Sequence, residues 1–339
     1  MCGICGILGR VDSHADAAVR RMTETLWHRG PDDDGIVCLS LGGDGHACGA
    51  IFGFRRLAIL DLSPSGHQPM VDPVTGDCLV FNGEIYNYPE LRESLAAVGV
   101  TVTSTGDAEV LLKGLSRWGE AFVEKLDGMY AFAFYKRATR RVLLARDPLG
   151  IKPLYIAEHE GRIVFGSEIR SLLASGVVPD EYDPAGVASY LAYGAPQDPL
   201  TVHRAIKSFP VGSFQWLEAD ERGSLRIGPR VRFWRFPLPA PAETMDAAVA
   251  ATHEALSRSV RRQLASDVPL GVFLSGGIDS GVIAALASEA SGQLKTFSVG
   301  FESENMASEL PIARETAARI GSDHHEIMIG KADALNLWQ

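Results

Sequence analysis

The chain has 339 residues, of which 46% are hydrophobic and 22% are charged, and its formal net charge is −10. This length suffices for two ordinary domains, and the negative charge argues against nucleic acid or an anionic membrane as the main partner. No apolar run reaches the roughly 18–20 residues that span a bilayer, and the N-terminus lacks the basic and apolar segments of a signal peptide. The odd number of cysteines, five, suits a reduced compartment. We therefore expect a cytoplasmic protein.

The first half of the chain combines helical patterns with short strand-like runs. Apolar spacing predicts a strand at 3–8 and helices at 15–27, 89–98 and 107–115. Further strand-like runs lie at 50–62, 78–81, 129–135, 141–146, 154–157 and 163–165. Turn residues separate these runs, which indicates a sheet-rich, layered domain.

The pattern changes after a proline-rich stretch at 236–241, which is typical of a linker or a surface turn. A long helix is expected at 245–265. Strands at 270–274, 295–299 and 325–329 then alternate with helices at 281–290 and 311–320. This βαβαβ order predicts a parallel sheet.

Cys2 directly follows the initiator Met1. Removal of Met1 would leave a thiol and a free α-amine on one residue, and both groups titrate near neutral pH. The amine could then accept the proton of the thiol and return it later, so one residue would hold nucleophile and base. The alternative is a small apolar cysteine at the start of a strand. The Cys2–Cys5 spacing also allows a metal or redox pair, which the apolar surroundings and the lack of a second such pair disfavour.

Four polar positions in the first half could serve the same site as Cys2. Arg56 ends an apolar run and could bind a carboxylate through both arms of its guanidinium. The Asn82 amide and the Gly83 N–H could form an oxyanion hole, followed by the Glu84 carboxylate. Asp107 lies at the expected N-cap of a helix. Each has a plainer interpretation: a surface arginine, an Asn-Gly hairpin turn, or a helix cap.

A glycine-rich loop lies where the strand at 270–274 gives way to a helix. Two glycines let backbone N–H groups approach an anion, and the helix N-terminus adds its dipole. Serine hydroxyls could bind phosphate oxygens, and a carboxylate could hold Mg²⁺. The alternative is a tight turn capped by Asp279 or Ser280. The loop reads Ser275, Gly276, Gly277, Ile278, Asp279 and Ser280.

That loop resembles the SGGxDS loop of the ATP pyrophosphatases, which cleave ATP to AMP and pyrophosphate. The resemblance implies an ATP site at Ser275, Gly276, Gly277, Asp279 and Ser280, with Asp279 as a Mg²⁺ ligand. It also places Leu274 and Val299 beside the adenine or the ribose.

Residues 1 to about 170 resemble the N-terminal-nucleophile glutamine amidotransferase domain, and the whole chain is similar to the glutamine-hydrolysing asparagine synthetases. The stretches that carry the likeness begin with Cys2-Gly3-Ile4 and include 28–32, 81–87, 146–150, 167–169 and 266–269. The implied fold is an α+β N-terminal domain, a layered αββα sandwich, followed by an incomplete α/β parallel-sheet nucleotide-binding domain. We expect a glutaminase domain at 1–210, a connecting segment at 211–243 and part of the synthetase domain at 244–339.

The resemblance also assigns roles. Cys2 attacks the glutamine amide, and Asn82 and Gly83 stabilise the oxyanion. Arg56 binds the α-carboxylate, while Glu84 and Asp107 hold the α-ammonium. Ammonia then amidates aspartate that ATP has activated as β-aspartyl-AMP. The implied small molecules are thus glutamine, aspartate, ATP and Mg²⁺, without a tightly bound organic cofactor; a homodimer stays open as the oligomeric state.

One departure from the family pattern is a missing second acidic, phosphate-binding motif of the type S-G-E-G-x-D-E. We therefore expect a truncated synthetase that hydrolyses glutamine without completing asparagine synthesis. Two alternatives remain: an amidotransferase for another carboxylate, and a non-catalytic binding module. The intact Cys2 disfavours relatives that close β-lactam rings, because they need no ammonia.

Overall fold

The computed structural model describes residues 1–339 except 43–47, 221–223, 239–240, 242–243, 303–307 and 337–339. The chain separates into two compact units, Met1–Pro237 and Leu238–Gln339. Among the described residues, no helix combines the length and hydropathy that crossing a bilayer requires.

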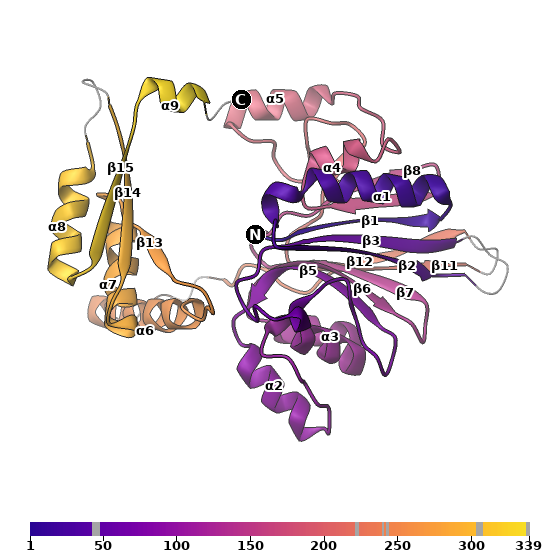
Figure 1. The fold of residues 1–339 in the computed structure, drawn as a ribbon, viewed down its shortest axis with the longest axis horizontal. Helices are drawn as coiled ribbons and strands as arrows, with labels where there is room; N and C mark the ends of the chain where they lie inside the picture. Colours follow the sequence, from indigo (N-terminus) through magenta and orange to yellow (C-terminus); the bar gives the residue numbers. More distant parts are fainter. Residues whose placement is uncertain (43–47, 221–223, 239–240, 242–243, 303–307, 337–339) are drawn as a thin grey trace. The chain divides into compact units, whose positions relative to one another are not determined.

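Two antiparallel sheets stack in the first unit (Figure 1). In spatial order, the first sheet contains β10 (Ile206–Ser208), β8 (Tyr155–His159), β9 (Arg162–Gly166), β1 (Gly3–Arg10), β3 (Cys48–Arg56) and β2 (Asp33–Ser40). The second contains β12 (Leu225–Arg232), β11 (Ser213–Ala219), β7 (Arg141–Arg146), β6 (Gly128–Lys136), β5 (Cys78–Ile85) and β4 (Met70–Val71).

Helices cover the outer face of each sheet. On the first sheet lie α1 (Ser13–Thr25) and α4 (Ile169–Ala174), with α5 (Pro184–Tyr193) on the same side (Figure 1). On the second lie α2 (Tyr88–Ala97) and α3 (Asp107–Trp118). Short 3₁₀ turns occupy Trp27–Arg29, Pro64–Gly66 and Gly119–Lys125. This arrangement confirms the αββα sandwich expected for the first half.

Side-chain alternation along β1 explains the layering. Ile4 and Leu8 point into the cluster between the two sheets, while Cys5 and Ile7 point toward α1. Because successive residues of a strand face opposite sides, an entirely apolar strand has both faces buried. β1 is therefore a central strand, between β9 and β3. Cys2 directly precedes this strand, whose two faces pack against the two apolar clusters.

The second unit is a small parallel sheet with helices. Its strands run in the order β13 (Gly271–Phe273), β14 (Lys295–Phe301) and β15 (Asp323–Ile329), and adjacent strands pair in parallel. Its helices are α6 (Met245–Gln263), α7 (Ile278–Ser291), α8 (Leu310–Ile320) and α9 (Lys331–Asn336). The expected βαβαβ order is confirmed.

The structure extends the second sheet into the segment expected to be a connection. β11 and β12 both lie within 211–243 and complete the edge of that sheet. The domain bounds predicted from the sequence, 1–210 and 244–339, stay predictions.

Candidate active site

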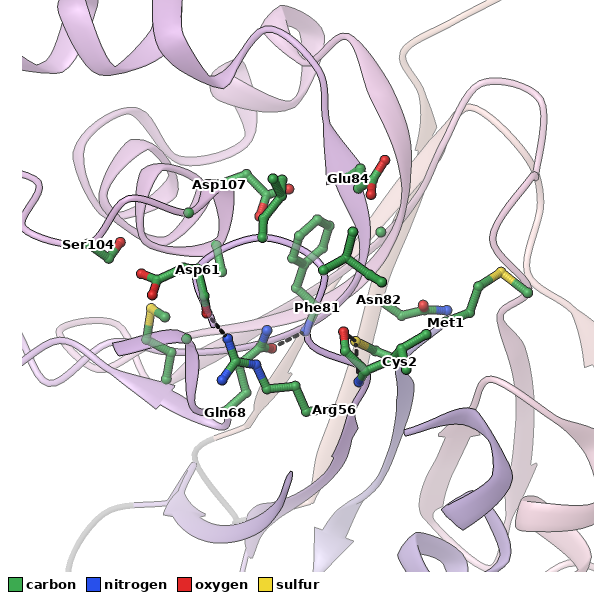
Figure 2. A pocket seen from close by; sticks show the side chains of 18 of the residues that line it. Met1, Cys2, Arg56, Asp61, Gln68, Phe81, Asn82, Glu84, Ser104 and Asp107 are labelled. Atoms are coloured by element: carbon green, nitrogen blue, oxygen red, sulfur yellow. Dashed lines mark hydrogen bonds between the residues drawn. The ribbon is translucent and has the colours of Figure 1, made fainter. Parts of the chain in front are cut away.

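A cavity of about 290 Å³ lies in the first unit (Figure 2). Its wall contains all six residues predicted for the glutamine site: Cys2, Arg56, Asn82, Gly83, Glu84 and Asp107. They come from the residue before β1, from β3 and β5, and from the start of α3. The fold therefore brings together side chains that lie more than 100 residues apart in the sequence.

Cys2 lies at the edge of this cavity, immediately before β1. Its Sγ accepts a hydrogen bond from the Leu57 N–H at 3.4 Å and lies 3.6 Å from the Leu57 carbonyl oxygen. The Arg29 Nε donates to the Cys2 carbonyl oxygen at 2.9 Å. Burial raises the pKa of the Cys2 thiol, while the Leu57 N–H and the terminal amine act in the opposite direction. The thiol is thus held in place and needs a base to become a nucleophile.

Cys5 lies in a different layer from Cys2. It packs in the cluster between the first sheet and α1, and its Sγ is 3.4 Å from the Thr23 hydroxyl. Burial raises the pKa of Cys5 to about 12. Cys2 instead packs against the cluster between the two sheets. Within the described parts of the chain, no group of three or more His, Cys, Asp or Glu side chains could hold a metal.

Asn82 and Gly83 lie inside strand β5, so the hairpin-turn interpretation is wrong. They pair with Ala131 and Tyr130 of β6. The Asn82 side chain is 1% exposed, and neither its Oδ1 nor its Nδ2 has a hydrogen-bond partner among the described residues. A buried amide without a partner costs free energy, about 1–3 kcal/mol, so its presence in a cavity wall points to a ligand that completes it.

The Gly83 N–H points toward the cavity side of β5. On either side of it, the Phe81 N–H donates to Gln68 Oε1 at 2.7 Å and the Ile85 N–H donates to Asp107 Oδ2 at 2.9 Å. Because N–H groups alternate between the two edges of a strand, the Gly83 N–H lies on the same edge, between these two. A side chain does not fit here, since a Cβ on Gly83 would lie 2.2 Å from the Met129 carbonyl oxygen.

Glu84 and Asp107, two of the three carboxylates in the cavity wall, lie in surroundings that favour their neutral forms. Burial, with a smaller contribution from Glu84, raises the pKa of Asp107 to about 7, against its hydrogen bond from the Ile85 N–H. Burial also raises the pKa of Glu84, which Lys152 and the terminal amine oppose. A cationic ligand would favour both ionised forms. Asp107 is the first residue of α3 and Gly106 is the N-cap, which corrects the expected position by one residue.

The Arg56 guanidinium binds the loop that follows β3. Its Nη1 donates to the Ser63 carbonyl oxygen at 3.0 Å, and its Nη2 donates to the Asp61 carbonyl oxygen. Arg56 is 7% exposed and lines the cavity. Two of its five N–H donors are thus engaged by the backbone, and capture of a carboxylate by the others stays a prediction.

Four further buried polar residues line the cavity and were missed by the sequence analysis: Asp61, Gln68, Ser104 and Lys152. Gln68 accepts from the Phe81 N–H, and Lys152 is 4% exposed. The only sequence signal for Lys152 was its place two residues after the stretch 146–150, which carries part of the family likeness. Nothing in its spacing from Cys2 indicates that the two residues meet.

In the second unit, the glycine-rich loop joins β13 to α7 as predicted. A pocket of about 410 Å³ beside it includes Leu274, Ser275, Ser280 and Val299 in its wall. Gly276, Gly277 and Asp279 belong to the loop and the first turn of α7 without lining that pocket. Four of the seven residues predicted for the ATP site therefore line this pocket, and the other three do not.

Side chains of the second unit satisfy several polar groups of this loop. The Ser275 N–H donates to Ser280 Oγ at 3.1 Å, and the Gly277 N–H donates to Ser275 Oγ at 3.1 Å. The Gly276 N–H donates to the Glu309 carboxylate at 3.2 Å. The Gly276 N–H thus already donates to an acidic side chain of the chain itself. Asp279 is exposed in the first turn of α7, where one carboxylate together with phosphate oxygens suits Mg²⁺.

Comparison with protein families finds two matches. Residues 1–226 match the glutamine amidotransferase domain, and residues 251–339 match asparagine synthase. The solved structure of glutamine phosphoribosylpyrophosphate amidotransferase from B. subtilis has a TM-score of 0.50 at 18% identity, covering 96% of this chain and 65% of that one. This likeness shows the fold alone.

Curated relatives match along almost the whole chain. Asparagine synthetase [glutamine-hydrolyzing] 1 of Bacillus subtilis is 35% identical over 99% of this chain and 51% of its own length. A putative asparagine synthetase [glutamine-hydrolyzing] of Mycobacterium tuberculosis is 37% identical over 96% of this chain and 51% of its own length. The chain spans about half the length of these relatives. It therefore belongs to the glutamine amidotransferase domain family, and its C-terminal part matches the asparagine synthase family model.

Proposed function

We propose that the first unit hydrolyses glutamine at Cys2 and that the chain serves glutamine-dependent asparagine synthesis. The glutaminase proposal rests mainly on one observation. The same cavity is lined by Cys2, which carries the thiol, by Asn82, whose amide has no described partner, and by Gly83, whose backbone N–H lies on the cavity side of β5. A nucleophile and two donors for an oxyanion are what acyl transfer from an amide requires.

In the proposed reaction, the α-amine of Cys2 takes the thiol proton, and the thiolate attacks the side-chain amide carbon of glutamine. The Asn82 Nδ2 and the Gly83 N–H stabilise the oxyanion. The amine then protonates the departing nitrogen, and ammonia leaves a thioester that water hydrolyses to glutamate. Arg56 would bind the substrate carboxylate, and Glu84 with Asp107 would bind its ammonium group.

For the second unit, we propose that the loop of Ser275 and Ser280 binds the phosphates of ATP, with Asp279 as the protein ligand of an accompanying Mg²⁺. The asparagine synthase match at 251–339 supports this assignment. ATP would activate aspartate as β-aspartyl-AMP with release of pyrophosphate, and ammonia would displace AMP to form asparagine. Aspartate as the acceptor follows the names of the relatives.

The first test is glutamate release from glutamine by the purified chain, with Cys2→Ala beside it. We expect release by the parent chain and none by Cys2→Ala, because no other thiol in the described cavity can replace Cys2. Cys38→Ala is the matched control, since it removes an exposed thiol outside the cavity and should leave the rate unchanged. Intact-mass measurement shows whether Met1 has been removed.

Absence of release from a folded chain that lacks Met1 would contradict the glutaminase proposal and favour a binding module. The acceptor is tested separately, by supplying ATP, ammonia and a panel of carboxylic acids. Pyrophosphate release that depends on aspartate supports the synthetase assignment. Pyrophosphate release that depends on another carboxylic acid would identify that acid, and not aspartate, as the acceptor.

A further inference from the structure

Lys152 is a buried cation whose role the proposed reaction leaves open. It is 4% exposed and lines the cavity together with Met1, Cys2 and Glu84. Among the described residues, its ammonium group makes no hydrogen bond within 3.5 Å, and no carboxylate lies within 4.0 Å of it. Burying a charge without a partner is costly, so its position in the cavity wall calls for a functional reason.

The backbone holds Lys152 firmly in this place. Its N–H donates to Asp147 Oδ2 at 2.9 Å, and its carbonyl oxygen accepts from Arg146 Nε at 2.9 Å. Asp147 is fully buried and also accepts from the N–H groups of Leu149 and Ile151, both at 3.0 Å. The loop after β7 is therefore a rigid support that directs one lysine side chain into the cavity wall.

Several charged or titratable groups in the cavity wall and around it act on the terminal amine or the thiol. The amine carried by Met1 in this structure is influenced by Cys2, Arg29, Lys152 and Asp32, and the thiol by the amine, Asp107 and Arg56. Lys152 itself is influenced by Glu84, Cys2, Arg29 and Asp147. Burial lowers the pKa of the amine, Cys2 and Asp32 raise it, and Arg29 and Lys152 lower it further. A cation near an amine disfavours its protonated form.

Arg29 and Lys152 differ in how they are partnered. The Arg29 Nη1 donates to the Glu168 carboxylate at 2.9 Å, so a negative charge offsets its own. Lys152 has no such partner among the described residues. Of the two, Arg29 lowers the pKa of the amine more, and Lys152 adds to that effect without a described ion-pair partner of its own.

We propose that Lys152 is a positioning residue for glutamine hydrolysis, whose ammonium group keeps the neighbouring terminal amine in the neutral form that accepts the thiol proton. This inference rests on the proposed glutaminase function of Cys2. Once Met1 is removed, the amine in question is that of Cys2 itself. Lys152 need not touch the substrate, because its charge acts through the amine.

The test is the pH profile of kcat/KM for glutamine hydrolysis by the intact chain and its Lys152→Met and Lys152→Arg variants. For Lys152→Met we expect the acidic limb to move up by about one pH unit, which is a loss of about tenfold at pH below the midpoint. The rate should recover at alkaline pH, where the amine is neutral in both proteins. Lys152→Arg should keep the parent profile, and so should Lys295→Met, which removes an exposed cation from the second unit.

A second measurement needs no glutamine. The rate of Cys2 alkylation by iodoacetamide against pH, followed by peptide mass, should show the same upward shift in Lys152→Met. A uniform loss at every pH, or an unchanged midpoint in a folded Lys152→Met, would overturn the inference while the glutaminase proposal stands. An inactive parent chain lacking Met1 would instead overturn the glutaminase proposal and this inference with it.

Discussion

The two candidate sites of this chain are built in opposite ways. In the first unit, site residues come from distant elements, and some of their polar groups are buried without partners, as at Asn82. In the second unit, most of the site lies in six consecutive residues, and neighbouring side chains satisfy several loop N–H groups.

In the first site, some buried polar groups lack hydrogen-bond partners among the described residues. In the second site, several backbone N–H groups of the loop already have partners within the chain. The cavity of the first unit is prepared for a ligand, because folding there leaves donors unused. A ligand of the second-unit loop must displace a carboxylate. Substitutions should therefore affect activity and stability differently in the two units.

The largest expected effect is that of Asn82→Ala. We expect kcat for glutamine hydrolysis to fall about 10²–10³-fold, because an oxyanion donor is lost. The free energy of unfolding should not fall and should rise by up to about 1–3 kcal/mol, because the variant removes a buried amide that has no described partner.

Asn87→Ala is the matched control for this variant. The Asn87 amide is fully engaged, donating to the Lys125 carbonyl oxygen and accepting from the Asp127 N–H, both at 2.9 Å. We expect this variant to lose about 1–2 kcal/mol of stability with its activity kept. Urea unfolding and steady-state kinetics on both variants test the contrast, which fails if Asn82→Ala is the less stable of the two.

The second prediction concerns the pH dependence of stability at Asp107. Its pKa is raised from 3.8 to about 7 in the folded chain, so the folded state holds the proton longer than the unfolded state does. Stability from this group is therefore lost as pH rises from about 4 to about 7. A shift of about three units corresponds to at most about 4 kcal/mol.

Asp107→Asn should remove this pH dependence, because the amide oxygen still accepts from the Ile85 N–H. Relative to the parent chain, the variant should gain stability between about pH 4 and 7 and keep a constant difference above that range. Urea unfolding at several pH values measures the difference, with Glu158→Gln as the exposed control. A difference that stays constant across this range would show that Asp107 is ionised throughout.

The third prediction compares two glycines. A Cβ on Gly83 would meet the Met129 carbonyl oxygen at 2.2 Å, whereas a Cβ on Gly277 meets only Ser275 Oγ, at 3.2 Å. We expect Gly83→Ala to cost about 1–3 kcal/mol and Gly277→Ala less than about 1 kcal/mol. Thermal unfolding measures both, and equal losses would mean that the second-unit loop is as tightly constrained as β5.

The smallest expected effect is at Glu309. Glu309→Ala should strengthen pyrophosphate binding by about two- to five-fold, because it frees the Gly276 N–H from a competing, solvent-screened carboxylate. Glu315→Ala removes the same charge from an exposed pair with Arg319 on the same helix and should leave the affinity unchanged. Calorimetric titration with pyrophosphate distinguishes the two; a weaker affinity in Glu309→Ala would make Glu309 a part of the site rather than a competitor.

Local pattern was sufficient for most elements and for the second-unit loop. The strands β6, β7 and β9 and the βαβαβ order of the second unit were predicted because their apolar runs are long and bounded by turn residues. Strands β10 and β12 were not identified, since one is three residues long and the other is an exposed edge rich in arginine. Their pairing is set by the neighbouring strand rather than by their own sequence.

The sequence predicted some residues of the glutamine cavity, and the tertiary structure was needed for the others. All six predicted residues were named from the sequence, since Cys2, Asn82, Gly83 and Glu84 lie in stretches that carry the family likeness and the resemblance assigned roles to Arg56 and Asp107. Only the tertiary structure showed that Asn82 belongs to a strand instead of a turn, since pairing with β6 overrides the local preference of an Asn-Gly pair. Lys152 lines the cavity from the loop after β7, which is held by hydrogen bonds to buried Asp147. That two residues 150 positions apart line one cavity cannot be seen from their spacing in the sequence, because tertiary packing decides it.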